Sequence, residues 1–220
     1  MQKKINKKSS FLRTSDFRLP KGFTLLELTV VAAIIGLLAA VILANYRGGE
    51  RQFALLRSTH QLAQDLRRAE EMAISSQKTP PGFETEEAFP RGGYGIYLKI
   101  DHEAPKGYRI ILFADCDGEG DYDESGTADC AGAAHGFGFS RDETIEELTL
   151  EEGVVIGALF SSSQLLEPLL ELSIAFKPPD PEISISGGDM ATIILSLKDA
   201  PTITRTITIN KVGLIDTKKP

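Results

Sequence analysis

The hydrophobic pattern of the chain begins with one long apolar run, from Phe23 to Leu43, that contains a single ionisable residue, Glu27. A helix needs about 20 consecutive apolar residues to span the hydrocarbon core of a bilayer. The run is too long for the apolar region of a secretory signal peptide, and no small-residue cleavage site follows it. It therefore predicts a transmembrane helix over residues 23–44, with an acid near its N-terminal edge, where lipid makes a charge costly.

A second helical pattern follows over residues 45–78. Apolar and small side chains recur there at alternating spacings of four and three, which places them on one stripe of a helix. The stripe consists of Leu55, Thr59, Leu62, Leu66, Ala69 and Ala73. We expect it to pack on the protein's own sheet. We also expect a bend or local melt at Gly48 and Gly49, and a helix end at Pro80 and Pro81.

The pattern changes to short alternating segments over residues 79–220, which predicts one β domain. In the first of these segments Ile96, Leu98 and Ile100 share a face. The expected strands are 95–100, 108–113, 147–150, 154–160, 172–176, 183–186, 193–197 and 203–209. Residues 212–215 are expected to extend the last strand past a bulge at Gly213. The fold class is therefore α+β, a long N-terminal helix packed on a C-terminal antiparallel β domain.

Charge is distributed unevenly between the start of the chain and the rest. Residues 1–22 contain seven basic residues and one acid, a net charge of +6, whereas the whole chain carries −7, which leaves about −13 for the remainder. The positive segment is expected to stay in the cytoplasm while the acidic remainder is exported. An acidic domain disfavours nucleic acid as a partner, although four basic residues near the C-terminus could form a local basic patch. They are Arg205, Lys211, Lys218 and Lys219.

The residues at the start of the apolar run closely resemble the class III leader of type IV prepilins and pseudopilins. Gly22 precedes the aromatic Phe23, and the acid Glu27 lies four residues further on. In that family a membrane peptidase cuts after the glycine and methylates the new N-terminus. The resemblance implies cleavage between Gly22 and Phe23, methylation of Phe23, and a role for Glu27 in assembly. It also implies prepilin peptidase and other pilin subunits as partners. A plain signal anchor with an accidental acid is the alternative.

The order of the later segments resembles one branch, the GspH/FimT-type minor pseudopilins. The similar segments are 93–98, 112–115, 174–178 and 207–215, while residues 178–181 replace the usual proline and glycine. This implies a cytoplasmic leader over 1–22 and an exported domain over 79–220. The chain would be a minor pilin or pseudopilin of a type IV pilus or a type II secretion system. A pilus-tip or membrane-displayed module that binds a surface, a secreted substrate or DNA is the alternative.

An acidic turn is the most specific feature of the exported domain. Its alternate acids, with a glycine after the third, reproduce the first nine positions of an EF-hand loop, but Gly126 stands where the closing glutamate would be. Glu124 or Asp129 could supply the missing oxygens. The candidate calcium ligands are Asp115, Asp117, Glu119, Asp121 and Asp123. A solvated hairpin turn rich in Asp and Gly is the alternative.

Two cysteines, Cys116 and Cys130, bracket this turn, and they are the only cysteines of the chain. On the exported side a disulfide between them would persist. Closing a loop of this size contributes about 3 kcal/mol in the chain-entropy model. Two free buried thiols are the alternative.

No set of residues with catalytic spacing accompanies these features. The three histidines, His60, His102 and His135, lie far apart in the sequence, without the spacing of a metal site. We therefore expect a structural or binding protein and not an enzyme.

Overall fold

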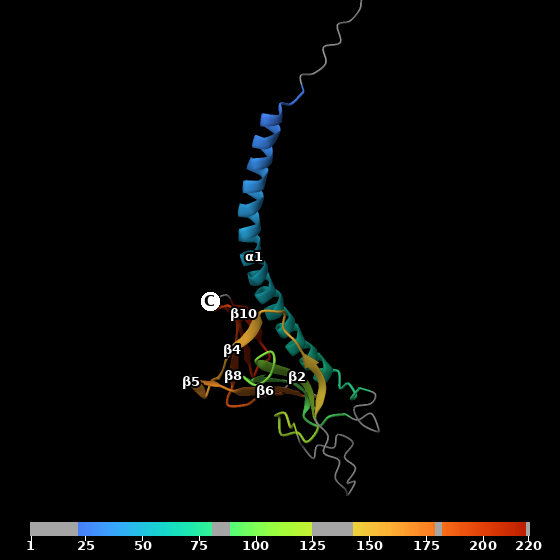
Figure 1. Ribbon diagram of the computed structural model, residues 1–220. Coiled ribbons are helices and arrows are strands. Elements are labelled where there is room, and N and C mark those ends of the chain that lie inside the picture. Colours follow the sequence, from blue (N-terminus) through green and yellow to red (C-terminus); the bar gives the residue numbers. More distant parts are fainter. Residues whose placement is uncertain (1–21, 81–88, 125–142, 179–181, 219–220) are drawn as a thin grey trace, which may run out of the picture. The chain divides into compact units, whose positions relative to one another are not determined.

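The computed structural model describes residues 22–80, 89–124, 143–178 and 182–218. It confirms the α+β class, an apolar N-terminal helix followed by an antiparallel β domain (Figure 1). The elements in chain order are α1 (Leu25–Ile74), β1 (Gly93–Ile100), β2 (Tyr108–Asp115), β3 (Thr144–Leu148), β4 (Val154–Ser161), β5 (Gln164–Leu169), β6 (Glu171–Lys177), β7 (Glu182–Ile185), β8 (Met190–Leu197), β9 (Ala200–Asn210) and β10 (Ile215–Lys218).

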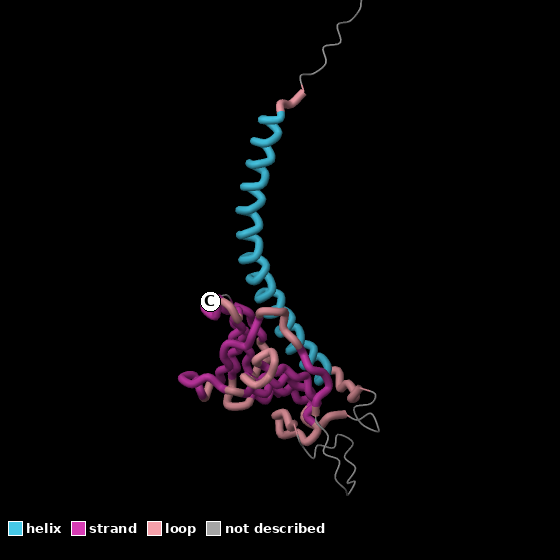
Figure 2. Tube along the Cα trace, in the orientation of Figure 1, coloured by secondary structure: helices cyan, strands magenta, loops and turns pink. Residues whose placement is uncertain are grey.

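Helix α1 is one element of 50 residues that belongs to two compact units, divided between Asn45 and Tyr46. It runs without interruption through Gly48 and Gly49 (Figure 2). The predicted local melt at these glycines is therefore wrong. Each glycine costs about 1 kcal/mol relative to alanine, which the helical residues on either side of the pair offset.

The part of α1 in the first unit has the length and composition of a membrane span. Leu25–Leu43 has a mean hydropathy of 2.7 over 19 residues, and none of it is buried within the chain. Apolar surface exposed along a whole helix needs a surrounding that is itself apolar. This segment therefore fits a helix anchored in a membrane.

The part of α1 in the second unit buries the predicted stripe, since all six residues are at most 2% exposed. All of them except Thr59 form the main hydrophobic core together with residues of both sheets. Ion pairs fix the helix at its flanks. Arg57 makes two hydrogen bonds, of 2.5 and 2.6 Å, to the carboxylate of Glu151, and Arg68 lies 2.9 Å from Glu146 on β3. The expectation that the stripe packs on the protein's own sheets is confirmed.

The helix ends before the prolines that were expected to stop it. Ser76 adopts a left-handed conformation, with φ of 47°. Its N–H donates to the carbonyl of Ala73, and the N–H of Gln77 donates to the carbonyl of Met72. This is the Schellman arrangement, which satisfies the last carbonyls of a helix. The hydroxyl of Tyr94 donates to the carbonyl of Gln77 at 2.9 Å and ties this end to β1.

The strands form two antiparallel sheets of five. The first sheet has the order β3-β2-β1-β6-β7, and the second has the order β10-β9-β8-β4-β5. The chain therefore visits the first sheet twice, returning to it at β6 after β4 and β5. Ile96 and Leu98 of β1 are fully buried and Ile100 packs against the same core, which confirms their shared face.

Some strands differ from those expected from the sequence. β3 begins three residues before the expected strand 147–150. β5 was not predicted; its Pro168 is tolerated because β5 is the edge of the second sheet. Residues 212–215 do not extend β9 past a bulge. The chain turns back at Gly213, with φ of 86°, and β10 pairs antiparallel with β9. The side chain of Asn210 accepts hydrogen bonds from two backbone N–H groups of this turn.

Candidate functional site

The residues at the proposed cleavage point form the first candidate site. Gly22, Phe23 and Thr24 precede the helix and are exposed, Phe23 to 80%. Glu27 lies in the first turn of α1 and is also exposed. A Cβ added at Gly22 would meet no described atom within 4 Å apart from its chain neighbours. Within the described part of the chain, this segment therefore packs against no other element.

The side chain of Thr24 caps the helix. Its Oγ1 accepts a hydrogen bond from the backbone N–H of Glu27 at 3.2 Å, and its carbonyl accepts one from Leu28. Thr24-Leu25-Leu26-Glu27 has the spacing of a capping box, in which a threonine precedes a glutamate by three residues. The spacing is visible in the sequence, yet Thr24 was missing from the predicted site residues.

The acidic turn after β2 forms the second candidate site, and two buried carboxylates hold it. Asp115, at the end of β2, is 1% exposed and accepts hydrogen bonds from the N–H groups of Gly118 at 2.7 Å and Gly120 at 2.9 Å. Both glycines have positive φ, of 85° and 88°, which only glycine adopts without strain. Asp115 thus acts as an anchor for the turn.

Glu143, just before β3, is the second buried carboxylate and was not identified from the sequence. It is 1% exposed and accepts hydrogen bonds from the N–H groups of Cys116 at 2.9 Å and Asp123 at 3.1 Å. It is separated from Cys116 by 27 residues, and no local pattern connects the two. The turn is therefore held from both ends, by one acid of β2 and one acid beside β3.

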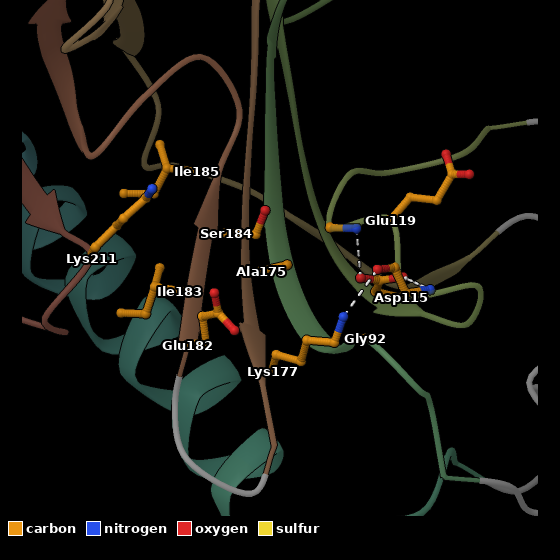
Figure 3. A pocket seen from close by; sticks show the side chains of 12 residues that line it. Gly92, Asp115, Glu119, Ala175, Lys177, Glu182, Ile183, Ser184, Ile185 and Lys211 are labelled. Atoms are coloured by element: carbon orange, nitrogen blue, oxygen red, sulfur yellow. Dashed lines mark hydrogen bonds between the residues drawn. The ribbon is translucent and has the colours of Figure 1, made fainter.

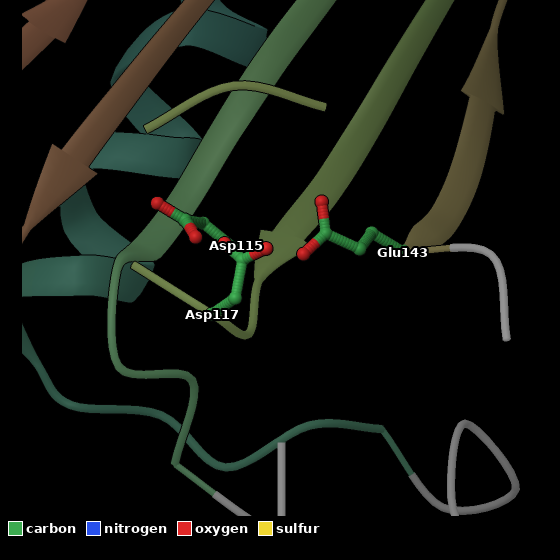
Figure 4. A group of neighbouring side chains, drawn as sticks. All are labelled: Asp115, Asp117 and Glu143. Atoms are coloured by element: carbon green, nitrogen blue, oxygen red, sulfur yellow. The ribbon is translucent and has the colours of Figure 1, made fainter. Parts of the chain in front are cut away.

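The five predicted calcium ligands do not come together as an EF-hand loop would bring them. Among the described residues, the group that could hold an ion consists of Asp115, Asp117 and Glu143, whose oxygens lie within 4.8 Å of one another (Figure 4). Glu119, Asp121 and Asp123 are exposed and lie outside that group. Both the EF-hand-like ligand set and calcium binding therefore stay predictions, and Asp115, Asp117 and Glu143 are a second candidate set.

The structure describes only one of the two residues considered for closing the loop. Glu124 pairs with Arg109 at 2.6 Å, and Asp129 lies outside the described residues. Cys130 also lies outside them, while Cys116 is buried at 2% exposure. The disulfide between the two cysteines therefore stays a prediction.

The turn folds over the outer face of the first sheet. Tyr122 stacks on Tyr97 with ring centroids 4.7 Å apart and meets Phe113 edge-on at 5.7 Å. A side chain at Gly95 would lie 2.5 Å from the Phe113 ring, so glycine is needed beneath these aromatics. The acidic turn thus has an aromatic base that fixes its position on the sheet.

A polar pocket lies beside the turn, between Gly118 and Gly120 on one side and β6 and β7 on the other (Figure 3). Lys177 donates a hydrogen bond to the carbonyl of Gly118 at 3.2 Å. Glu182 and Ser184 of β7 line the opposite wall. The pocket therefore presents both charges in a small space and contains no set of catalytic residues among those described.

Burial raises the pKa of both anchoring carboxyls. The pKa of Asp115 rises to about 6, and that of Glu143 rises to about 7, although the backbone hydrogen bonds to each act in the opposite direction. The neighbouring charge of Asp117 adds to both shifts. Near neutral pH the ionised form of these buried carboxyls is therefore unfavourable. Either a proton or a bound cation would offset their negative charge.

Comparison with known proteins concerns the N-terminal segment. The model of the prokaryotic N-terminal methylation motif matches residues 18–43. The chain carries a type IV pilin-like signal. No curated protein and no solved structure matches the chain. The signal supports a type IV pilin-like or pseudopilin-like precursor that is anchored in a membrane, and it implies processing by prepilin peptidase and assembly with other pilins.

The pH dependence of stability follows from the two raised pKa values. Between about pH 4 and pH 7 the folded chain binds more protons at Asp115 and Glu143 than the unfolded chain does, so the free energy of unfolding should fall as pH rises through this window. Glu143→Gln should have a lower free energy of unfolding than the wild type at pH 5, and its free energy of unfolding should fall less steeply as pH rises. Urea unfolding of the full chain in detergent measures both. Glu152→Gln, an exposed acid, is the control, and a slope as steep in Glu143→Gln as in the control would contradict the assignment.

Calcium should oppose this loss of stability. We expect calcium to raise the melting temperature more at pH 8 than at pH 5, because protons compete for the same carboxylates. Asp117→Asn should remove the rise, whereas Asp121→Asn should keep it, since Asp121 lies outside the cluster. Thermal unfolding with calcium and with a chelator tests this. No shift in the wild type would refute calcium binding, and equal losses in both variants would favour the EF-hand-like ligand set.

Proposed function

We propose that the chain is a minor pilin or pseudopilin, a structural subunit that is cleaved after Gly22 and methylated at Phe23. The observation that carries the proposal is the methylation-motif match over residues 18–43, which coincides with an apolar helix whose first turn contains Glu27. The same helix continues as the buried stripe of the β domain. A membrane anchor and a folded exported head are the two parts that such a subunit requires.

The charge distribution supports the direction of insertion. A leader of net charge +6 stays on the cytoplasmic side, where the peptidase acts, and the acidic β domain crosses the membrane. Once the leader is removed, the apolar helix moves from lipid into the core of a filament. Glu27 then lies away from water, and pairing with the methylated amino group of a neighbouring Phe23 would offset its desolvation.

The order of strand segments supports the GspH/FimT branch as the finer assignment. The segments that carry this resemblance lie on β1, β2, β6 and the β9–β10 pair. A membrane helix joined to a folded head suits a subunit of a type IV pilus and a subunit of a type II secretion pseudopilus equally. The proposal therefore covers both filaments.

A binding module for DNA has less support than a structural subunit. Of the four basic residues near the C-terminus, Lys211 pairs with Asp189 at 2.5 Å and Lys218 lies 3.2 Å from Asp216. Carboxylates beside these amines reduce the positive potential that a phosphate backbone needs. We therefore propose other pilin subunits as the partners, and a structural role without enzymatic activity.

Replacing the glycine before the cut should block processing. Gly22→Leu should leave the full-length precursor in the membrane, because the peptidase of this family needs a minimal side chain there. A Cβ at Gly22 would meet no described atom within 4 Å apart from its chain neighbours, so the change should not disturb the packing of the folded chain. Gly36→Leu is the control, since a Cβ at Gly36 is equally free of contacts but lies inside α1, away from the cut. Electrophoretic mobility after co-expression with a prepilin peptidase measures cleavage. Normal cleavage of Gly22→Leu would refute the assigned position.

Removing the acid of the first turn should separate processing from assembly. Glu27→Leu should insert and be cleaved, but its incorporation into filaments should fall about tenfold or more, because a buried methylammonium group loses its partner. Glu27→Asp, which keeps the charge, is the control and should retain more incorporation. The amount of each variant in sheared filaments measures the effect. Wild-type incorporation of Glu27→Leu would contradict the role of the carboxylate.

A further inference from the structure

The cap at Thr24 lies directly after the proposed cleavage point. α1 begins at Leu25, and Gly22, Phe23 and Thr24 are not helical. The hydroxyl oxygen of Thr24 accepts a hydrogen bond from the N–H of Glu27. This N–H is one of the first of the helix, which have no acceptor within it. Only Phe23 separates the capping residue from Gly22, the residue that precedes the scissile bond.

Without the Thr24 hydroxyl, the first N–H groups of the helix would need other acceptors, and the carbonyls of the preceding residues supply them if the helix becomes longer. If the helix gained a turn, the N–H of Glu27 would bond to the carbonyl of Phe23, and the N–H of Leu26 would bond to the carbonyl of Gly22. An N–H group without a partner is costly at the edge of an apolar phase, so loss of the cap drives this extension. The carbonyl of Gly22 is the one that a peptidase must attack, and a helix would enclose it.

We propose that Thr24 is a positioning residue for leader cleavage, because its side chain ends the helix and keeps the Gly22–Phe23 peptide outside it. This inference rests on the proposed function. It assigns Thr24 a role in the precursor, before any contact with other subunits. The specificity of the peptidase would then have two parts. The residue before the cut has to be small, and the helix has to begin after it.

The test compares three variants of the full-length precursor in detergent with a purified prepilin peptidase. Thr24→Val keeps the shape of the side chain and removes the hydroxyl, whereas Thr24→Ser keeps the hydroxyl. Thr29→Val is the matched control, since the hydroxyl of Thr29 bonds to the carbonyl of Leu26 within the helix and caps nothing. Initial cleavage rates over a range of precursor concentrations give kcat and KM for each variant.

The cap affects the fraction of precursor that is ready for cleavage, so its loss should raise KM and leave kcat close to the wild-type value. From the usual contribution of a threonine cap, we expect the KM of Thr24→Val to rise roughly two- to thirtyfold. Thr24→Ser and Thr29→Val should both behave like the wild type. This pattern separates capping from a general effect of altering the helix.

Two results would overturn the inference while the proposed function remains. One is a kcat/KM of Thr24→Val equal to or above that of the wild type. The other is equal impairment of Thr24→Val and Thr24→Ser, which would mean that the peptidase reads the shape of the side chain. A wild-type precursor that is not cut, or is cut elsewhere than after Gly22, would instead overturn the proposed function itself.

Discussion

One continuous helix has to suit two surroundings, and the rest of the structure depends on this constraint. Leu25–Leu43 is apolar on every side and finds no burial within the chain. The residues after Tyr46 bury one stripe in the core of a folded domain. A helix of this kind needs an apolar medium for its first part, whether lipid or the helices of other subunits. The leader directs the first part of the helix into this medium, and the buried stripe attaches the second part to the folded domain. The acid of the first turn is the one charge that the apolar medium has to accommodate.

The β domain shows a second constraint, the burial of two carboxylates beside the acidic turn. Asp115 and Glu143 each hold two backbone N–H groups of the acidic turn, and their raised pKa values record the cost of burial. The hydrogen bonds fix the turn over the aromatic residues of the first sheet. The stability of this turn is thereby linked to the protonation of the two acids, and to any cation that replaces the proton.

The parts that local sequence patterns determine were predicted well. The six residues of the amphipathic stripe are buried because helical periodicity alone decides which face they share. The pilin-like signal was identified from Gly22, Phe23 and Glu27, which are close in sequence, and a family model matches it. What the sequence did not reveal depends on contacts between distant residues or on unusual backbone. Glu143 joins Asp115 from across the chain, and Ser76 ends the helix in a conformation rare for residues other than glycine. β5 contains Pro168, which the edge of a sheet tolerates, and an edge position depends on the pairing of distant strands.

The proposed function depends on maturation of the precursor at Phe23. The most direct measurement is the intact mass and the N-terminal peptide of the protein, extracted from membranes after co-expression with a prepilin peptidase. We expect a chain that begins at N-methylated Phe23. A chain that still carries residues 1–22 would contradict it, and would leave a membrane-anchored β domain whose best remaining feature is the acidic turn held by Asp115 and Glu143.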